Sequence, residues 1–154
     1  MKVLIMYDSY FGNTEKIAQA LRDSLGKDAK AEVIKVSDCK VEQLNGLDLF
    51  IVGSPTRAFR ATPPVTAFLN SIPPNSLNGI KVAAFDTRVA PEDIKSSILR
   101  FIVKAGGYAA KPIANMLVKK GGNLMVPPEG FAVVGNEGPL KEGELDRAKV
   151  WIKP

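Results

Sequence analysis

The chain has 154 residues, of which 45% are hydrophobic and 24% are charged, as in one ordinary globular domain, and we expect a single domain over residues 1–154. The net charge of +5 comes from scattered Lys and Arg residues without the pattern of a nucleic-acid-binding module, so we expect no nucleic-acid partner. The sequence contains no histidine and one cysteine, Cys39. This excludes hydrolytic triads, an internal disulfide and ordinary zinc or iron sites. The near absence of cysteine also fits a cytoplasmic protein.

Strands and helices are predicted to alternate along the first half of the chain. Short apolar runs indicate buried strands, whereas apolar residues at three- and four-residue spacing indicate helices. The expected elements are a strand at 2–7, a helix at 15–25, an edge strand at 32–36, a short helix near 41–44 and a second buried strand at 47–52. No apolar run approaches the roughly 20 residues that a membrane-spanning helix needs.

The second half continues the same alternation. A Pro-Pro pair suits the start of a helix. The expected elements are a helix at 65–69, a buried strand at 80–85, helices at 92–104 and 109–120, one interrupted strand made of 124–126 and 131–134, and a helix at 142–152. This order predicts an α/β fold with a parallel sheet and helices on both faces.

Three loops follow the carboxyl ends of predicted buried strands. They comprise residues 8–14, 54–59 and 86–88. Because ligands of open parallel sheets bind outside the carboxyl ends of the strands, we expect these loops to converge on one site.

The first of these loops has the features of a phosphate site. Backbone amides and the helix dipole would favour an anion at the start of the helix, and Ser9, Asn13 and Thr14 add side-chain donors. Gly12 would let the backbone approach the anion closely. The loop has no lysine and matches neither the nucleotide-triphosphatase nor the dinucleotide fingerprint, which favours the single phosphate of a mononucleotide. The alternative is that these are only turn and cap residues.

The same residues carry a resemblance to the flavodoxin family. Tyr7, Ser9, Gly12, Thr14 and Ala18 match its first-loop pattern, while Phe11 stands where many members have Thr. The resemblance implies a flavodoxin-like three-layer sandwich with a five-stranded parallel sheet in the order 2-1-3-4-5. It also implies binding of flavin mononucleotide (FMN).

Carried over from the family, the phosphate would be held by the first loop and the isoalloxazine would be flanked by the other two. The implied cofactor-binding residues are Ser9, Tyr10, Phe11, Gly12, Asn13, Thr14, Ser54, Pro55, Thr56, Arg57, Ala58, Phe59, Asp86, Thr87 and Arg88. No side chain is nominated as catalytic and no metal is expected. The third loop offers no aromatic residue to stack on the flavin, and the second offers only Phe59. Arg57, Arg60 and Arg88 are either solvated loop residues or a cationic rim around the flavin.

The predicted function is an FMN-binding electron carrier that serves redox partner proteins. Because Gly53-Ser54-Pro55-Thr56-Arg57 also resembles the flavin- and quinone-reductase branch, one alternative is an oxidoreductase that takes electrons from NAD(P)H and passes them to a flavin or quinone. Another alternative is an interaction module without a cofactor. The apolar segment 92–104 is expected to form a helix that packs on the sheet. The alternative hypotheses are a lid over the flavin, a dimer contact or a peripheral contact with a membrane.

Overall fold

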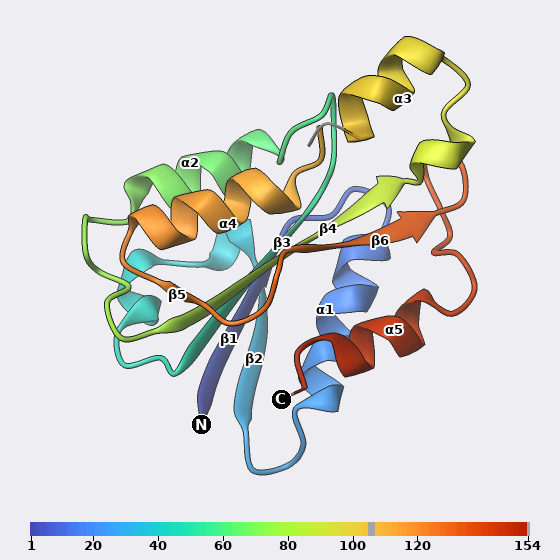
Figure 1. The fold of residues 1–154 in the computed structure, drawn as a ribbon. Helices are drawn as coiled ribbons and strands as arrows, with labels where there is room; N and C mark the ends of the chain where they lie inside the picture. Colours follow the sequence, from blue (N-terminus) through green and yellow to red (C-terminus); the bar gives the residue numbers. More distant parts are fainter. Residues whose placement is uncertain (105–106, 154) are drawn as a thin grey trace.

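The computed structural model describes residues 1–104 and 107–153 and is built around one β-sheet (Figure 1). Its strands run in the order β2-β1-β3-β4-β5, every neighbouring pair is parallel, and the predicted order 2-1-3-4-5 is therefore confirmed. The strands are β1 (Lys2–Tyr7), β2 (Lys30–Lys35), β3 (Leu49–Pro55), β4 (Lys81–Val89), β5 (Asn123–Leu124) and β6 (Glu129–Val133).

β5 and β6 share one edge of β4, and β6 is a sixth strand beyond the five predicted. β5 pairs with the start of β4 at Lys81 and Val82, and β6 pairs with its end from Phe85 to Val89. The sequence between them contains Pro127 and Pro128, which have no amide hydrogen to donate to a strand ladder. The predicted interruption is confirmed at these two prolines, but Glu129 and Gly130 already belong to β6, so the single interrupted strand that was predicted is two strands.

Helices cover both faces of the sheet (Figure 1). Helices α2 (Pro63–Ser71) and α4 (Ala110–Lys119) lie on one face, and α1 (Asn13–Ser24) and α5 (Glu144–Trp151) lie on the other. Three short 3₁₀ helices, η1 (Val36–Asp38), η2 (Val41–Leu44) and η3 (Pro91–Asp93), belong to the connections.

The strands divide their side chains between two cores, as the period-two geometry of a strand requires. Leu4 and Met6 of β1 join the core under α2 and α4, whereas Val3 and Ile5 join the core under α1 and α5. In the second core, the rings of Phe85, Phe131 and Trp151 meet edge to face with centroids 6.0–6.1 Å apart. Trp151 is therefore a packing residue of this core.

Helix α3 (Ser97–Lys104) does not cover the sheet, so the favoured prediction for segment 92–104 is wrong. Both faces are already occupied, and the segment instead lies beyond the carboxyl end of β4 at the upper right of Figure 1. Ile98 and Phe101 remain 72% and 74% exposed there. Within the described ranges, no helix has the length and apolar character needed to cross a membrane.

Candidate functional site

The loop between β1 and α1 is held in shape by its own side chains. The amide of Ser9 donates to Asp8 Oδ1 at 2.9 Å, and the amide of Gly12 donates to Ser9 Oγ at 2.9 Å. Asp8 is buried, and its Oδ2 accepts a hydrogen bond from Thr62 Oγ1 at 2.6 Å, which ties the loop to the start of α2. Gly12 precedes α1 with φ of 88°, a conformation that favours glycine. These bonds fix the course of the backbone ahead of the helix.

Five backbone amides at the head of α1 have no acceptor in residues 1–104 or 107–153. The first helical bond runs from the amide of Lys16 to the carbonyl of Gly12 at 3.1 Å, which leaves the earlier amides free. The free amides belong to Tyr10, Phe11, Asn13, Thr14 and Glu15. Unpaired amides and the positive end of the helix dipole together favour an anion at this position.

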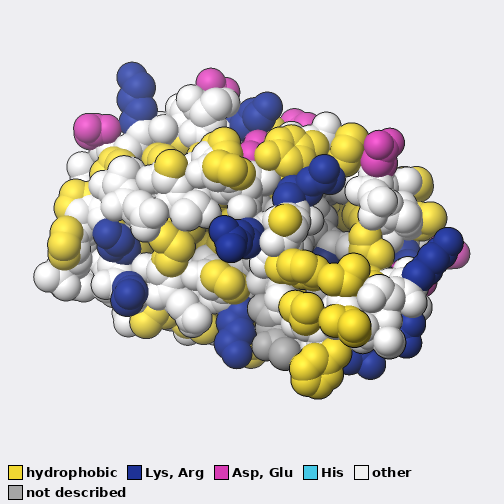
Figure 2. Space-filling model, turned by 90° about the horizontal axis from the view of Figure 1, so that it is seen from above, with side chains coloured by type: hydrophobic (Ala, Val, Ile, Leu, Met, Phe, Trp, Pro, Cys, Tyr) yellow, Lys and Arg dark blue, Asp and Glu magenta, His cyan; other side chains and the backbone are white. Residues whose placement is uncertain are grey.

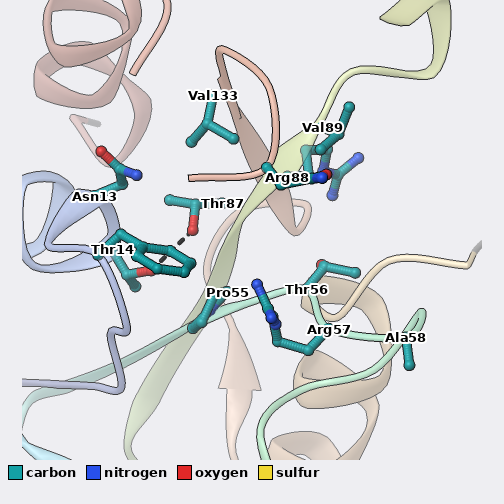
Figure 3. A pocket seen from close by; sticks show the side chains of 12 residues that line it. Asn13, Thr14, Pro55, Thr56, Arg57, Ala58, Thr87, Arg88, Val89 and Val133 are labelled. Carbon is teal, nitrogen blue, oxygen red and sulfur yellow. Dashed lines mark hydrogen bonds between the residues drawn. The ribbon is translucent and has the colours of Figure 1, made fainter. Parts of the chain in front are cut away.

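A cavity of about 190 Å³, here called the Thr87 cavity, opens beside this loop (Figure 3). Its walls come from the three segments that were predicted to converge and from the end of β6 with the loop after it. The third segment, 86–88, is not a loop as predicted, because β4 continues to Val89 and includes it. It is lined by Phe11, Asn13, Thr14, Pro55, Thr56, Arg57, Ala58, Thr87, Arg88, Val89, Val133 and Asn136.

Two buried hydroxyl groups meet at the wall of this cavity. Thr14 Oγ1 and Thr87 Oγ1 are 2.8 Å apart, the contact drawn as a dashed line in Figure 3, and it joins α1 to β4. The contact uses one of the two hydroxyl hydrogens, so the other is left to donate to a ligand. Asn13 Nδ2 donates to the carbonyl of Glu137 at 2.8 Å, which joins the loop after β6 to the same corner.

Arg57 brings a positive charge to a loop that has none of its own. Its guanidinium carbon lies 5.3 Å from the centre of the Tyr10 ring and 5.7 Å from that of Phe11, within the range of cation–π contacts. In Figure 3 its side chain rises from the loop after β3 toward the cavity. Among the described residues, no carboxylate forms an ion pair with Arg57. Its charge is therefore available to an anion.

A tight turn presents Arg57 to the cavity. The amides of Arg57 and Arg60 donate to each other's carbonyls at 2.8 and 2.9 Å, and the turn between them places Ala58 and Phe59 at φ of 48° and 66°. Positive φ at two successive non-glycine residues is costly, on the order of 1–2 kcal/mol each. The amides of Ala58 and Phe59 have no acceptor among the described residues. The turn is therefore strained, and its two free amides can donate to a ligand.

Arg88 is not a free cation of the rim. Its Nε and Nη2 donate to the two oxygens of Asp86, each at 2.6 Å, and the amide of Ala110 donates to Asp86 Oδ2 at 2.9 Å. Asp86 is fully buried; burial raises the pKa of its carboxyl, while Arg88 and the Ala110 amide oppose that rise. The Arg88 guanidinium also lies 3.7 Å from the centre of the Tyr108 ring. Within residues 1–104 and 107–153, Arg57 and Arg60 form no ion pair, so the uncompensated positive charge of the rim comes from these two residues.

A second cavity of about 520 Å³, here called the Tyr108 cavity, adjoins the first and shares Thr56, Ala58, Val89 and Asn136 with it. Phe59 and Tyr108 both line this cavity, so the site has two aromatic residues where the predicted loops offered one. Tyr108 is held by a hydrogen bond from its hydroxyl to the carbonyl of Val89 at 2.9 Å. The remaining lining residues are Asp93, Ile94, Lys95, Leu99 and Gly135. The two cavities together form one elongated site with a polar end and an apolar end.

The sequence matches the flavodoxin domain family over residues 4–125. The chain belongs to the flavodoxin family. No curated protein matches the sequence at a significant level.

Solved flavodoxin structures share the fold of this flavodoxin domain. A flavodoxin from the domain Archaea aligns with 99% of this chain and 94% of its own at 24% identity and a TM-score of 0.76. Flavodoxin 2 from Bacillus cereus aligns with 99% and 95% at 22% identity and a TM-score of 0.77. Rubredoxin oxygen:oxidoreductase from Desulfovibrio gigas aligns with 98% of this chain at 23% identity and a TM-score of 0.71, but only 34% of that longer chain is covered.

The structure of this flavodoxin domain brings most of the predicted site residues together. Nine line the Thr87 cavity, and Phe59 lines the Tyr108 cavity. Ser54 and Asp86 do not reach either cavity, because both are fully buried and act as supports. Ser54 Oγ accepts the amide of Thr62 at 3.0 Å and donates to the carbonyl of Pro55 at 2.9 Å. Ser9, Tyr10 and Gly12 form the loop at the head of α1 without lining the cavities.

Sequence reasoning missed the contributions of Tyr108 and of the loop after β6. Val133 is the last residue of β6 and Asn136 follows it, so the convergence rule applied to this strand would have included them. Tyr108 precedes α4 in the sequence, and it is held at the site by its own hydrogen bond to Val89 and by the bond of the Ala110 amide to Asp86, both near the carboxyl end of β4.

Proposed function

We propose that this flavodoxin domain binds FMN without a covalent bond and carries electrons between redox partners. The observation that carries the proposal is the set of five free amides beside the Thr14–Thr87 hydroxyl pair, opening into a cavity that continues to an apolar end. A phosphomonoester with an extended chain and a planar apolar ring matches this order of polar and apolar walls.

Each part of the site would hold a different part of FMN. The five free amides at the head of α1, with the side chains of Ser9 and Asn13, would bind the phosphate, and Arg57 would balance its charge. The Tyr108 cavity would take the ring, with Phe59 and Tyr108 as its aromatic walls and the free amides of the turn as donors. The flavin, when bound, supplies the redox chemistry by accepting and returning one or two electrons.

The chain itself controls the environment of the cofactor. The Asp86–Arg88 pair fixes the wall behind Tyr108 without adding net charge, whereas Arg57 adds positive charge to the wall of the Thr87 cavity and Arg60 adds it in the same turn. A positive surround favours added electrons on a bound group, because it stabilises the negative charge that they bring. The same charges would attract acidic redox partners or the phosphates of a nicotinamide cofactor.

The test is a titration of the flavin-free protein with FMN and with riboflavin, which lacks the phosphate, followed by flavin fluorescence. We expect FMN to bind at least tenfold more tightly than riboflavin, because only FMN gains charge-assisted hydrogen bonds worth about 1.5–3 kcal/mol each. Arg57→Gln should weaken FMN binding about tenfold and leave riboflavin binding unchanged. Arg22→Gln, a change of an exposed arginine on α1, serves as the matched control.

Failure to take up FMN would contradict the proposal and support an interaction module without a cofactor. Equal affinities for FMN and riboflavin would contradict the assignment of the phosphate to the head of α1. If FMN binds, turnover of NAD(P)H with a quinone separates the two redox roles: sustained turnover indicates a reductase, and its absence indicates a carrier.

A further inference from the structure

Helix α3 turns its apolar side outward instead of inward. Ile98, Phe101 and Ile102, spaced three and four residues apart, lie on one face of the helix and are 72%, 74% and 41% exposed. The opposite side is fastened to the protein: Arg100 donates through Nε and Nη2 to the carbonyl of Ile94 at 3.2 and 2.8 Å. The amphipathic helix therefore presents large apolar side chains to whatever lies outside the molecule.

The exposed aromatic residues gather at the same end of the molecule. Among the described residues, the aromatic side chains with large exposure are Tyr10, Phe11, Phe59 and Phe101, and each follows the carboxyl end of a strand. Figure 2, which looks onto this end, shows hydrophobic side chains clustered toward the lower right with Lys and Arg close by. The apolar surface is therefore an extended feature of this end of the protein.

The charge of this surface is positive. The segments 56–62 and 94–104 contain Arg57, Arg60, Lys95, Arg100 and Lys104 and no acidic residue. The two segments are neighbours, because both line the Tyr108 cavity. The adjoining η3 contains two acidic residues, Glu92 and Asp93, and Asp93 is paired with Lys141 at 2.5 Å. The five basic side chains of the two segments therefore outnumber the acidic side chains beside them.

We infer that this end of the protein docks on an anionic lipid bilayer, with α3 lying in the interface. Interfacial helices combine an outward apolar face with basic residues, and aromatic rings favour the boundary between lipid and water. Each lysine or arginine close to an anionic membrane contributes to binding. A second copy of this chain is a poorer occupant, since pairing the same surfaces would bring like charges together.

Docking in this way places the Tyr108 cavity at the membrane surface. Ile94 and Leu99 form part of the wall of that cavity, and Leu99 is 42% exposed on α3. The inference does not depend on FMN, because it rests on the outer surface of α3 and on charge.

The test is co-sedimentation of the full chain with vesicles of phosphatidylcholine alone and of phosphatidylcholine mixed with phosphatidylglycerol. We expect binding to the anionic vesicles, little binding to the neutral ones, and a decrease with added salt. Ile98→Ser/Phe101→Ser should weaken binding about tenfold or more, because it removes the most exposed apolar side chains of α3. The control Val118→Ser/Val150→Ser changes two exposed apolar residues on α4 and α5 and should bind as the unmodified protein does.

A second pair of variants tests charge without touching the apolar face. Lys95→Gln/Lys104→Gln should weaken binding to anionic vesicles by roughly fivefold per lysine, and the control Lys27→Gln/Lys149→Gln by less. Equal loss in the two pairs would overturn the role of this surface, as would equal binding to neutral and anionic vesicles. Circular dichroism melting of each variant separates lost binding from lost folding.

Two further results would assign the surface to another occupant and overturn the inference. One is a dimer in analytical ultracentrifugation that Ile98→Ser/Phe101→Ser dissociates, combined with no vesicle binding. The other is binding to immobilised polyglutamate, as a model of an acidic protein, without binding to anionic vesicles.

Discussion

The hydroxyl pair of Thr14 and Thr87 allows a quantitative test of how the site is held together. The two side chains are 1% and 5% exposed, and their oxygens are 2.8 Å apart. Replacing either threonine by valine preserves its shape but leaves the other hydroxyl buried without its partner, at a cost of about 1–3 kcal/mol. Replacing both removes the second unsatisfied group, so the double variant should lose less stability than the sum of the single variants, by about 1 kcal/mol.

The measurement is urea unfolding of the four flavin-free proteins that make up this double-mutant cycle. In a protein of this size each kcal/mol corresponds to about 2–4 °C in Tm, so thermal melting gives an independent reading. Thr66→Val, a threonine on α2 whose hydroxyl makes no side-chain bond within the described residues, is the control and should change little. Strictly additive losses would refute the reasoning, because they would show that the two hydroxyls do not depend on each other.

Three further predictions concern other parts of the fold. Gly53→Ala should destabilise the protein by about 1–3 kcal/mol in urea unfolding, because the added Cβ would lie 2.0 Å from Phe85 Cζ. Adding Phe85→Leu to this variant should recover part of the lost stability, and no recovery would contradict this account. Hydrogen bonds from Arg147 lower the pKa of Glu144, although burial opposes this shift. Its contribution to stability is therefore present above its usual pKa of 4.5 and is lost as the pH falls through the lower value in the folded protein. Thermal melts across the pH range should show this loss of stability in acid, and Glu144→Gln should reduce it. Burial raises the pKa of the Cys39 thiol to about 11, so alkylation by iodoacetamide at pH 8 should be slow in the native protein and faster in urea, and equal rates would refute the shift.

The sequence predicted the sheet well because its signals were local. The apolar runs at β1, β3 and β4 have the pattern of strands buried on both faces, and each is a strand in the structure. The convergence of the three segments followed from strand direction alone, and all three contribute residues to the Thr87 cavity, although segment 86–88 proved to be the end of β4 and not a loop. The strand order came from the family resemblance, which the family match supports.

The failures have a common physical cause, since they concern contacts between distant parts of the chain. The apolar composition of segment 92–104 predicts burial, but it could not show that α1, α2, α4 and α5 already cover the sheet. The sequence likewise gave no means of distinguishing Arg88, paired with buried Asp86, from Arg57, which no described carboxylate pairs. The aromatic contribution of Tyr108 depends on its hydrogen bond to Val89 at the end of β4, 19 residues earlier in the chain.

The two sides of the site differ in how they are anchored, and this difference sets the route by which a ligand would enter and leave. One side is β4, which pairs with β3, β5 and β6 and carries buried residues on both faces. The other side consists of the Arg57–Arg60 turn and the α3 segment, which have few bonds to the sheet. Amide hydrogen exchange should therefore be slowest along β4 and fastest at Ala58 and Phe59. A flavin would exchange through the turn while β4 stays in place, so opening of the turn, more than global unfolding, would limit how fast the cofactor is gained and lost.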